Sequence, residues 1–202
     1  MKDTVIFDLG GVLIDWNPRY VYRSIFRTEA AMEHFLGRVC TSKWNEKQDE
    51  GRLFAEATDL LSSEFPEYKS EISSYYGRWE DMLGDALHDT VSILSGLKNS
   101  NKYRLYALTN WSAESFPVAL GRFEFLSWFD DILVSGREKL IKPDPAIYDL
   151  MISRFEIRRE GAVFIDDNQA NVEGARKTGI DAIHFRSPAG LADELAAFGI
   201  LL

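Results

Sequence analysis

The sequence has little of three things on which many protein classes depend: cysteine, histidine and positive charge. Cys40 is the only cysteine in 202 residues, so no disulfide can form within the chain, and we expect a reducing, cytoplasmic environment. The three histidines show no metal-ligand spacing. With 23 Lys and Arg against 32 Asp and Glu, the net charge of −9 argues against a binder of nucleic-acid backbones. The net charge does not exclude a small anionic substrate, because such a substrate needs only a local positive site.

Long hydrophobic runs are absent as well. No apolar stretch approaches the roughly 20 residues that a membrane-spanning helix needs. The N-terminal apolar run is interrupted by Asp8 and no signal-peptidase-like site follows it, so we expect no signal peptide and no membrane partner. What the sequence does have is 46% hydrophobic and 13% aromatic residues, enough for a packed core. A monomer and a homodimer are both compatible with this composition.

Short apolar runs separated by amphipathic stretches organise most of the chain. Runs typical of buried parallel strands cover residues 5–7, 103–108, 131–134, 162–165 and 182–185. Helical spacing covers residues 90–97, 145–155, 171–178 and 191–198. This alternation predicts an α/β, Rossmann-like fold, in which right-handed crossovers build a parallel sheet with helices on both faces.

Residues 16–87 break this alternation. The interval is polar, rich in aromatic side chains and helical in its periodicity, and it contains no strand-like run. We predict an α-helical cap over residues 16–87, inserted into an α/β core of residues 1–15 and 88–202. Four residues are candidates for lining a substrate pocket: Trp16, Trp44, Asn45 and Arg52. The last three lie in or next to a loop-like stretch, residues 44–51. A tryptophan in such a segment is also a common core residue.

Polar residues follow the predicted strands at the points where the strands end. The set consists of three carboxylates, a lysine, a hydroxyl and an amide: Asp8, Asp166, Asp167, Lys142, Thr109 and Asn110. Ligands of a parallel sheet bind outside the carboxyl ends of its strands, so we expect these side chains to converge. Plain structural roles compete with this interpretation, because Asn168 and Asp144 each precede a predicted helix and would cap it.

Together, these residues suit metal-assisted phosphoryl transfer. Carboxylate oxygens are preferred ligands of Mg²⁺, which neutralises a phosphoryl group so that an anionic nucleophile can approach it. Asp8 is then the candidate nucleophile, forming an aspartyl-phosphate. Lys142 would supply a fixed positive charge, while Thr109 and Asn110 would donate hydrogen bonds to the phosphoryl oxygens.

Four ordered motifs make the chain resemble a haloacid dehalogenase superfamily hydrolase. They are Phe-Asp-Leu-Gly-Gly-Val-Leu at residues 7–13, Leu-Thr-Asn at 108–110, Lys-Pro-Asp at 142–144 and Phe-Ile-Asp-Asp-Asn at 164–168. The resemblance covers residues 3–186 and implies a Rossmann-like core with a helical cap. It implies Asp8 as the nucleophile. Mg²⁺ would be held by Asp8, the carbonyl of Gly10 and Asp167, with Asp166 beside the metal. It also implies that Thr109, Asn110 and Lys142 hold the phosphate.

Gly10 departs from the pattern of the superfamily. Its phosphatases usually carry a second aspartate two residues after the nucleophile, as general acid and base, and losing such a group costs about 10²–10⁴-fold in rate. The form present here resembles a sugar-phosphate phosphatase branch that includes α-D-glucose-1-phosphate phosphatase. The expected substrate is therefore a small phosphorylated metabolite, such as a sugar phosphate, with a good leaving group.

Two alternatives remain. A 2-haloacid dehalogenase also lacks the second aspartate, because its carboxylate attacks carbon without a metal, and Asn168 falls where those enzymes place an asparagine. The pair Asp166 and Asp167 favours a phosphatase, since a carboxylate substrate needs no cation-binding acids nearby. The other alternative is a binding module that kept the fold and lost full activity at Gly10.

Overall fold

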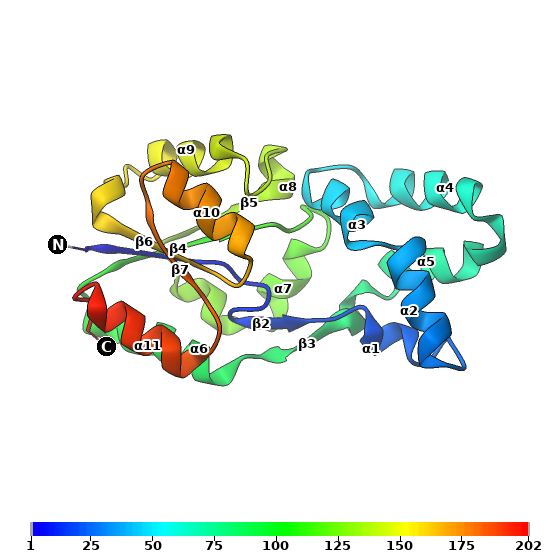
Figure 1. The fold of residues 1–202 in the computed structure, drawn as a ribbon, viewed down its shortest axis with the longest axis horizontal. Helices are drawn as coiled ribbons and strands as arrows, with labels where there is room; N and C mark the ends of the chain where they lie inside the picture. The colour runs from blue at the N-terminus through cyan, green and yellow to red at the C-terminus, as the bar shows by residue number, and fades with distance from the viewer. Residues whose placement is uncertain (1, 202) are drawn as a thin grey trace.

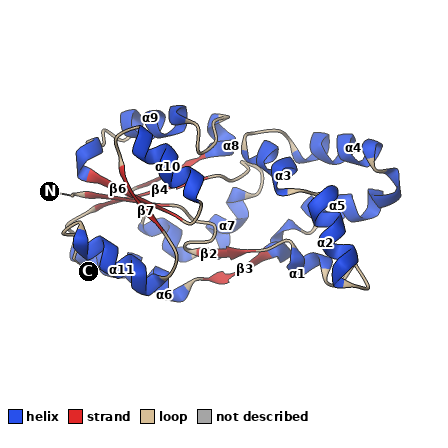
Figure 2. Cartoon of the chain, in the orientation of Figure 1, coloured by secondary structure: helices blue, strands red, loops and turns tan. Residues whose placement is uncertain are grey.

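The computed structural model describes residues 2–201, which form a sheet-centred part and a set of helices beside it (Figures 1 and 2). The main sheet has five parallel strands in the order β5-β4-β1-β6-β7. The strands are β1 (Thr4–Phe7), β4 (Arg104–Thr109), β5 (Asp131–Val134), β6 (Ala162–Asp166) and β7 (Asp181–His184). All five strands predicted from apolar runs are confirmed.

Helices cover both faces of this sheet, which confirms the predicted α/β fold. On one face lie α9 (Pro145–Arg154) and α10 (Gln169–Lys177), and on the other α6 (His88–Ser100), α7 (Phe116–Arg122) and α11 (Pro188–Ala197) (Figure 1). Successive side chains of a strand point to opposite faces. In β1, Ile6 belongs to the hydrophobic cluster that contains α9 and α10, while Val5 and Phe7 belong to the cluster that contains α6 and α11.

Five α-helices and two short 3-10 helices lie between two short strands, β2 (Ile14–Trp16) and β3 (Leu83–Ala86). The α-helices are α1 (Arg19–Tyr22), α2 (Glu29–Arg38), α3 (Ser42–Asp49), α4 (Phe54–Glu64) and α5 (Lys69–Gly77). Residues 19–77 are termed the helical insertion below. Its interior is aromatic: the ring centroid of Tyr22 lies 4.9 Å from that of Phe35 and 6.1 Å from that of Tyr75. The insertion lies at one end of the sheet (Figure 1).

The strand β3 contradicts the prediction that residues 16–87 contain no strand. It pairs antiparallel with β2, and this ribbon joins the two chain crossings between the sheet and the helical insertion. Only Leu83 of β3 is buried, so no apolar alternation marks the strand in the sequence. A side chain at Gly84 would overlap the Asp15 carboxylate, so glycine suits this crossing. The ribbon lies close to the predicted domain boundaries, which remain predictions.

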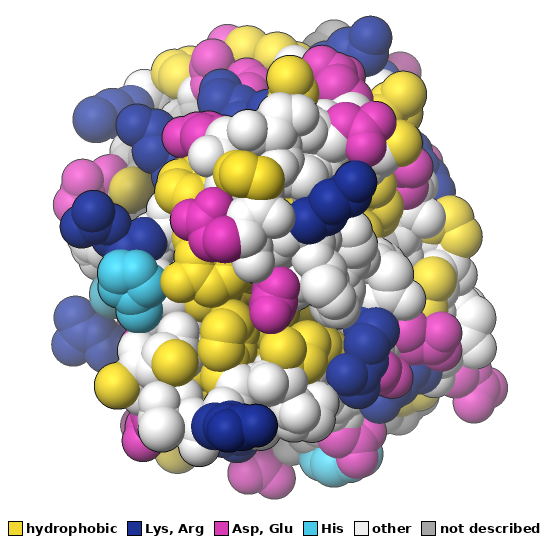
Figure 3. Space-filling model, turned by 90° about the vertical axis from the view of Figure 1, so that its right-hand side faces the viewer, with side chains coloured by type: hydrophobic (Ala, Val, Ile, Leu, Met, Phe, Trp, Pro, Cys, Tyr) yellow, Lys and Arg dark blue, Asp and Glu magenta, His cyan; other side chains and the backbone are white. Residues whose placement is uncertain are grey.

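The surface of the helical insertion is mixed in character. At its outer end, hydrophobic side chains lie among charges of both signs (Figure 3). None of the helices within residues 2–201 has both the length and the apolar character that crossing a membrane requires.

Candidate active site

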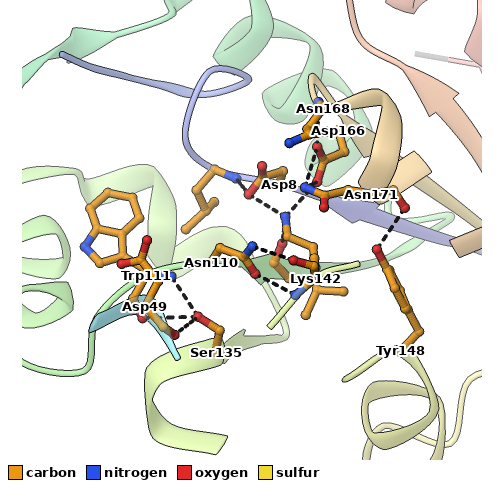
Figure 4. Close-up of polar contacts among 12 residues, drawn as sticks. Asp8, Asp49, Asn110, Trp111, Ser135, Lys142, Tyr148, Asp166, Asn168 and Asn171 are labelled. Atoms are coloured by element: carbon orange, nitrogen blue, oxygen red, sulfur yellow. Dashed lines mark hydrogen bonds and ion pairs between the residues drawn. The ribbon is translucent and has the colours of Figure 1, made fainter. Parts of the chain in front are cut away.

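The ends of three neighbouring strands bring the predicted polar residues to one edge of the sheet (Figure 4). Asp8 follows β1 directly, Thr109 is the last residue of β4, and Asp166 is the last residue of β6. The strands are in register there, because Phe7 lies opposite both Ala107 and Ile165. Asp8 therefore lies between the ends of β4 and β6, as the strand ends predict.

Lys142 lies at the centre of this edge with a fully buried side chain. Its ammonium contacts three oxygens: Asp8 Oδ1 at 3.0 Å, Asp166 Oδ2 at 2.7 Å and the Leu108 carbonyl at 2.9 Å. An ammonium has three donors, so every donor has a partner. Because a buried charge is costly unless it is paired, these contacts fix Asp8 and Asp166 in place.

Both oxygens of Asp166 are occupied by hydrogen bonds. The Asn168 N–H donates to Oδ1 at 2.8 Å, and Nδ2 of Asn171 lies 3.1 Å from each oxygen. Tyr148 in turn donates its hydroxyl to the Asn171 carbonyl at 2.8 Å. Asn168 also caps α10, since its side chain accepts from the N–H of Ala170, so the structural role considered for this residue is confirmed. Asp166 is thus oriented by its neighbours before any ligand arrives.

Asn110 is engaged in a way that the sequence does not predict. Its side chain accepts from the Lys142 N–H at 2.9 Å and donates to the Lys142 carbonyl at 3.0 Å. A side-chain amide that bonds both backbone groups of one residue fixes the loop around that residue. Asn110 therefore positions Lys142, and it also lines the cavity described below. Thr109 is buried, and phosphate binding by Thr109 and Asn110 stays a prediction.

Three carboxylates come close enough to share one cation. Oxygens of Asp8, Asp166 and Asp167 lie within 4.8 Å of one another, and Asp167 is the exposed member. Such donors suit Mg²⁺, which takes one or two carboxylates together with water and phosphate. Gly11 has a φ of +73°, and a side chain there would overlap the Asp167 carboxylate. The donor set fits Mg²⁺, while the carbonyl of Gly10 as a further ligand stays a prediction.

The charges in this cluster shift one another's pKa. Burial raises the pKa of the Asp8 carboxyl, which Lys142 lowers and Asp166 raises further. Burial also raises the pKa of Asp167. Burial alone would lower the pKa of Lys142, but the Asp166 and Asp8 carboxylates raise it above its ordinary value, so the lysine stays charged. Interacting titratable groups of this kind concentrate at functional sites.

A cavity of about 350 Å³ lies beside Asp8 and is lined by residues of both the sheet edge and the helical insertion. This volume is within the range of about 300–1,000 Å³ that is usual for small-molecule sites. Polar groups of the lining include Asp8, Asn110, Asp167, Asn45 and Asp49. Three indole side chains, Trp16, Trp79 and Trp111, also line it. The cavity therefore combines the charged groups Asp8 and Asp167 with a remainder in which indole rings alternate with polar side chains such as Asn45 and Asp49.

Two of the four pocket candidates reach this cavity and two do not. Trp16 and Asn45 line it. The ring centroid of Trp44 lies 5.1 Å from that of Tyr75, in the aromatic interior of the helical insertion. Arg52 donates from Nε to Gln48 Oε1 at 2.7 Å, also within the insertion. Neither Trp44 nor Arg52 is among the lining residues, and contact of these two with a substrate stays a prediction.

The expectation of a loop around residues 44–51 is wrong, because α3 runs from Ser42 to Asp49. Thr41 caps this helix, its hydroxyl accepting from the Trp44 N–H at 3.1 Å. Trp44 is the only large apolar residue of the helix, so it shows no apolar periodicity that would identify it. Asn45 and Asp49 are four residues apart on α3 and thus share the face that meets the cavity.

Asp49, Trp79 and Trp111 are site residues that the sequence did not reveal. The spacing from Asn45 to Asp49 would have pointed to Asp49 if α3 had been recognised as a helix. Trp111 directly follows the Leu-Thr-Asn motif, which is a usable signal. Trp79 has no sequence signal: its ring centroid lies 5.6 Å from that of Trp111, a contact between distant parts of the chain.

The sequence is similar to those of known hydrolases. Residues 5–185 match the family described as haloacid dehalogenase-like hydrolase. The chain is 28% identical over 193 residues to a sesquiterpene phosphatase from Aspergillus oryzae, across 94% of this chain and 93% of that protein. It is 25% identical over 190 residues to a phosphorylated carbohydrates phosphatase from Thermotoga maritima, across 90% of this chain and 84% of that protein.

Solved structures share the fold. A haloacid dehalogenase family enzyme from Bacteroides thetaiotaomicron, in its magnesium complex, has a TM-score of 0.72 at 21% identity, across 92% of this chain and 93% of that chain. An L-2-haloacid dehalogenase from Xanthobacter autotrophicus, with chloropropionic acid covalently bound, has a TM-score of 0.63 at 18% identity, across 100% and 85%. At these identities the likeness concerns the fold alone. The family match, however, spans residues 5–185, and the chain belongs to the haloacid dehalogenase-like hydrolases.

Proposed function

We propose that this hydrolase is a Mg²⁺-dependent phosphohydrolase that acts on a small phosphorylated metabolite through an aspartyl-phosphate on Asp8. The observation that carries the proposal is the placement of Asp8. It lies 3.0 Å from the buried Lys142 ammonium, shares a cation-sized carboxylate cluster with Asp167, and lines a cavity. The two relatives named as phosphatases support the reaction type.

The chain's own residues suit each part of such a reaction. Lys142 fixes the Asp8 carboxylate and brings a positive charge to the point where phosphoryl charge collects. An Asp8 oxygen attacks phosphorus, the bond from phosphorus to the leaving oxygen breaks, and water then hydrolyses the aspartyl-phosphate. Asp8, Asp167 and the Gly10 carbonyl would hold Mg²⁺, with Asp166 beside them. The metal's contribution, when bound, is to neutralise the phosphoryl oxygens.

The helical insertion is proposed to act as a cap that selects the substrate. Within the predicted cap (residues 16–87), Trp16, Asn45, Asp49 and Trp79 line the cavity opposite the sheet edge, and Trp111 adds a third indole from the predicted core (residues 1–15 and 88–202). Indole faces pack against apolar surface, and their N–H groups can donate hydrogen bonds. The proposed substrate is therefore a phosphate monoester of a small alcohol, with sugar phosphates as the first class to assay.

The dehalogenase alternative has one observation in its favour and one against it. In its favour, Gly10 leaves the position of the usual acid–base residue without a side chain. Against it, Asp167 and Asp166 add negative charge next to Asp8. That charge would repel the carboxylate of a haloacid substrate, whereas it would bind the cation that a phosphate substrate needs. This balance favours phosphate ester hydrolysis.

A phosphatase assay with 4-nitrophenyl phosphate, run with Mg²⁺ and after exhaustive chelation, tests the proposed function. We expect turnover that chelation abolishes and added Mg²⁺ restores. Asp8→Asn should remove turnover and keep the fold, because the Lys142 ammonium would still pair with the Asp166 carboxylate, which lies 2.7 Å from it. Halide release from 2-chloropropionate without metal would establish the dehalogenase instead. No turnover across a broad set of phosphorylated metabolites would support the binding module.

A further inference from the structure

The position of Gly10 leaves the departing alcohol without its usual proton donor. A Cβ added at Gly10 would have no heavy atom within 4 Å, so no neighbouring side chain fills the place of the missing carboxylate. An alkoxide is a poor leaving group unless it receives a proton as the bond to phosphorus breaks. If the enzyme hydrolyses esters of ordinary alcohols, a donor must therefore reach the cavity from another element.

Three carboxylates line the cavity within the described part of the chain: Asp8, Asp167 and Asp49. Asp8 is the proposed nucleophile, and Asp167 belongs to the carboxylate cluster that suits Mg²⁺. Attacking and leaving oxygens lie roughly in line across phosphorus, so the leaving oxygen faces away from Asp8. Asp49, the last residue of α3, reaches the cavity from the helical insertion rather than from the sheet edge. It is the carboxylate that remains for the leaving group.

The end of α3 is fixed against the sheet-centred part. Ser135, at the start of α8 (Ser135–Glu138), donates its hydroxyl to the Asp49 carbonyl at 2.5 Å. The same hydroxyl accepts from the Trp111 N–H at 2.9 Å, which places Asp49 beside the end of β4 (Figure 4). Asn45 Nδ2 donates to Asp49 Oδ2 at 3.0 Å. The carboxyl group is thus held in a defined position although it comes from the insertion.

The surroundings of Asp49 favour its protonated form. Burial raises the pKa of its carboxyl to about 7, with the Ser112 N–H opposing the rise and Glu46 adding to it. Glu46 lies on α3 itself, and α5 presents the hydroxyls of Tyr75 and Tyr76, which are neutral at this pH. A group with a pKa near the working pH is suited both to giving and to taking a proton.

We propose that Asp49 is the general acid and base of the phosphohydrolase, supplied by the helical insertion in place of the carboxylate that Gly10 lacks. This inference rests on the proposed function. In the first step, an Asp8 oxygen forms a bond to phosphorus, the electron pair of the ester bond leaves with the alcohol oxygen, and the Asp49 carboxylic acid gives that oxygen its proton. In the second step, the Asp49 carboxylate takes a proton from water as the water oxygen attacks phosphorus. The bond to Asp8 then breaks, inorganic phosphate leaves, and Asp49 is again protonated.

A comparison of leaving groups tests this role. We expect Asp49→Asn to lower kcat/KM for benzyl phosphate by about 10²–10⁴-fold, because the benzyl alkoxide needs the proton. The value for 4-nitrophenyl phosphate, whose leaving group needs none, should fall far less. With 4-nitrophenyl phosphate the variant should also release one nitrophenolate per enzyme in a burst, because hydrolysis of the aspartyl-phosphate has lost its base. The matched control Glu50→Gln changes the next carboxylate, which pairs with Lys47 outside the cavity, and should behave as wild type.

Restoring the missing carboxylate gives a second, independent readout. A Cβ at Gly10 meets no heavy atom within 4 Å, so we expect that adding Gly10→Asp to Asp49→Asn recovers benzyl phosphate turnover. Equal losses on both substrates, or no loss on either, would overturn the role of Asp49 while leaving the phosphohydrolase intact. A wild-type enzyme that turns over neither ester would instead overturn the proposed function. Should Asp49→Asn fail to fold, the leaving-group comparison of Asp49→Glu with wild type decides the question.

Discussion

At the scale of single residues, the site is built around the buried ammonium group of Lys142. Lys142 contacts Asp8 and Asp166, and Asn110 holds the backbone of Lys142 on both sides. Removing any member of such a network leaves a buried polar group without its partner, which costs more than the contact itself contributes. The catalytic groups and the stability of the sheet edge therefore depend on the same side chains.

Lys142→Met should destabilise the protein by about 3–5 kcal/mol, because it leaves two buried carboxylates without their counterion. Urea denaturation monitored by tryptophan fluorescence measures this change in the free energy of unfolding. Lys47→Met is the matched control: the Lys47 side chain is 56% exposed and pairs with Glu50 on the surface, so its loss should cost less than about 1 kcal/mol. Similar values for the two variants would mean that the buried pair is not held as the structure shows.

Gly11→Ala should weaken Mg²⁺ binding, because the added methyl group would displace Asp167 and φ is +73° at this position. Substitutions that disturb the orientation of a metal ligand typically cost about 10–100-fold in affinity. Titration of activity with Mg²⁺ measures the change. Gly37→Ala in α2 serves as the control, since a Cβ there meets nothing within 4 Å and Gly37 does not line the cavity. If the Mg²⁺ requirement of Gly11→Ala matches that of Gly37→Ala, Asp167 is not a ligand.

At the scale of elements, the helix α3 connects the helical insertion with the chemistry. Its last residue, Asp49, is bonded to Ser135 of α8, and Asn45 from the same face lines the cavity. Gln48 is the only fully buried residue of the helix, and Trp44 packs against Tyr75 in the interior of the insertion. The N-terminal cap at Thr41 fixes where α3 begins.

Thr41→Ala should lower the free energy of unfolding by about 1 kcal/mol, the usual cost of losing an N-cap hydroxyl. It should also lower kcat/KM, because a frayed α3 positions Asp49 and Asn45 less well. Thr28→Ala removes the corresponding cap of α2, where the Thr28 hydroxyl accepts from Ala31, and α2 has no residue in the cavity lining. The two variants should lose similar stability, as measured by urea denaturation. If both also lose activity equally, α3 has no special role.

The strands of the sheet could be predicted from the sequence because a buried strand requires a continuous run of apolar residues. Strands buried on both faces read as short apolar runs, and the polar residues at the ends of these runs predict that Asp8 and Asp166 converge. The ribbon β2–β3 has no such apolar run, and its pairing joins residues far apart in the chain. The polar sequence of α3 has no apolar periodicity, so neither this helix nor the place of Asp49 could be predicted from it. Trp44 and Arg52, predicted as pocket residues, make contacts inside the insertion.

At the scale of the whole molecule, the helical insertion and the sheet are not independent bodies. One hydrophobic cluster contains Val5 and Phe7 of β1 together with Phe35 and Ile72 of the insertion. Trp79 and Trp111 meet across the junction with ring centroids 5.6 Å apart. Because Asp49 is half-buried at the same junction, its protonation state should contribute to the stability of the entire fold.

That contribution has a definite sign and pH range. The pKa of Asp49 is about 7 in the folded chain and has an ordinary value of 3.8, so the folded state binds this proton more tightly than the unfolded state. The resulting stabilisation is complete below pH 3.8 and is lost as the pH rises through about 7. Asparagine does not titrate, so Asp49→Asn lacks this dependence. Its free energy of unfolding should therefore rise relative to wild type between pH 5 and pH 7 and then stay level.

Urea denaturation of both proteins in metal-free buffer, at intervals from pH 5 to pH 8.5, measures this difference. Other groups titrate alike in the two proteins, so subtracting one curve from the other isolates Asp49. A difference that does not change with pH would mean that the Asp49 carboxyl titrates as it does in water. In that case it would be ionised at neutral pH and could not donate the proton that the leaving alcohol requires. The stability measurement thus tests the proposed acid independently of any substrate.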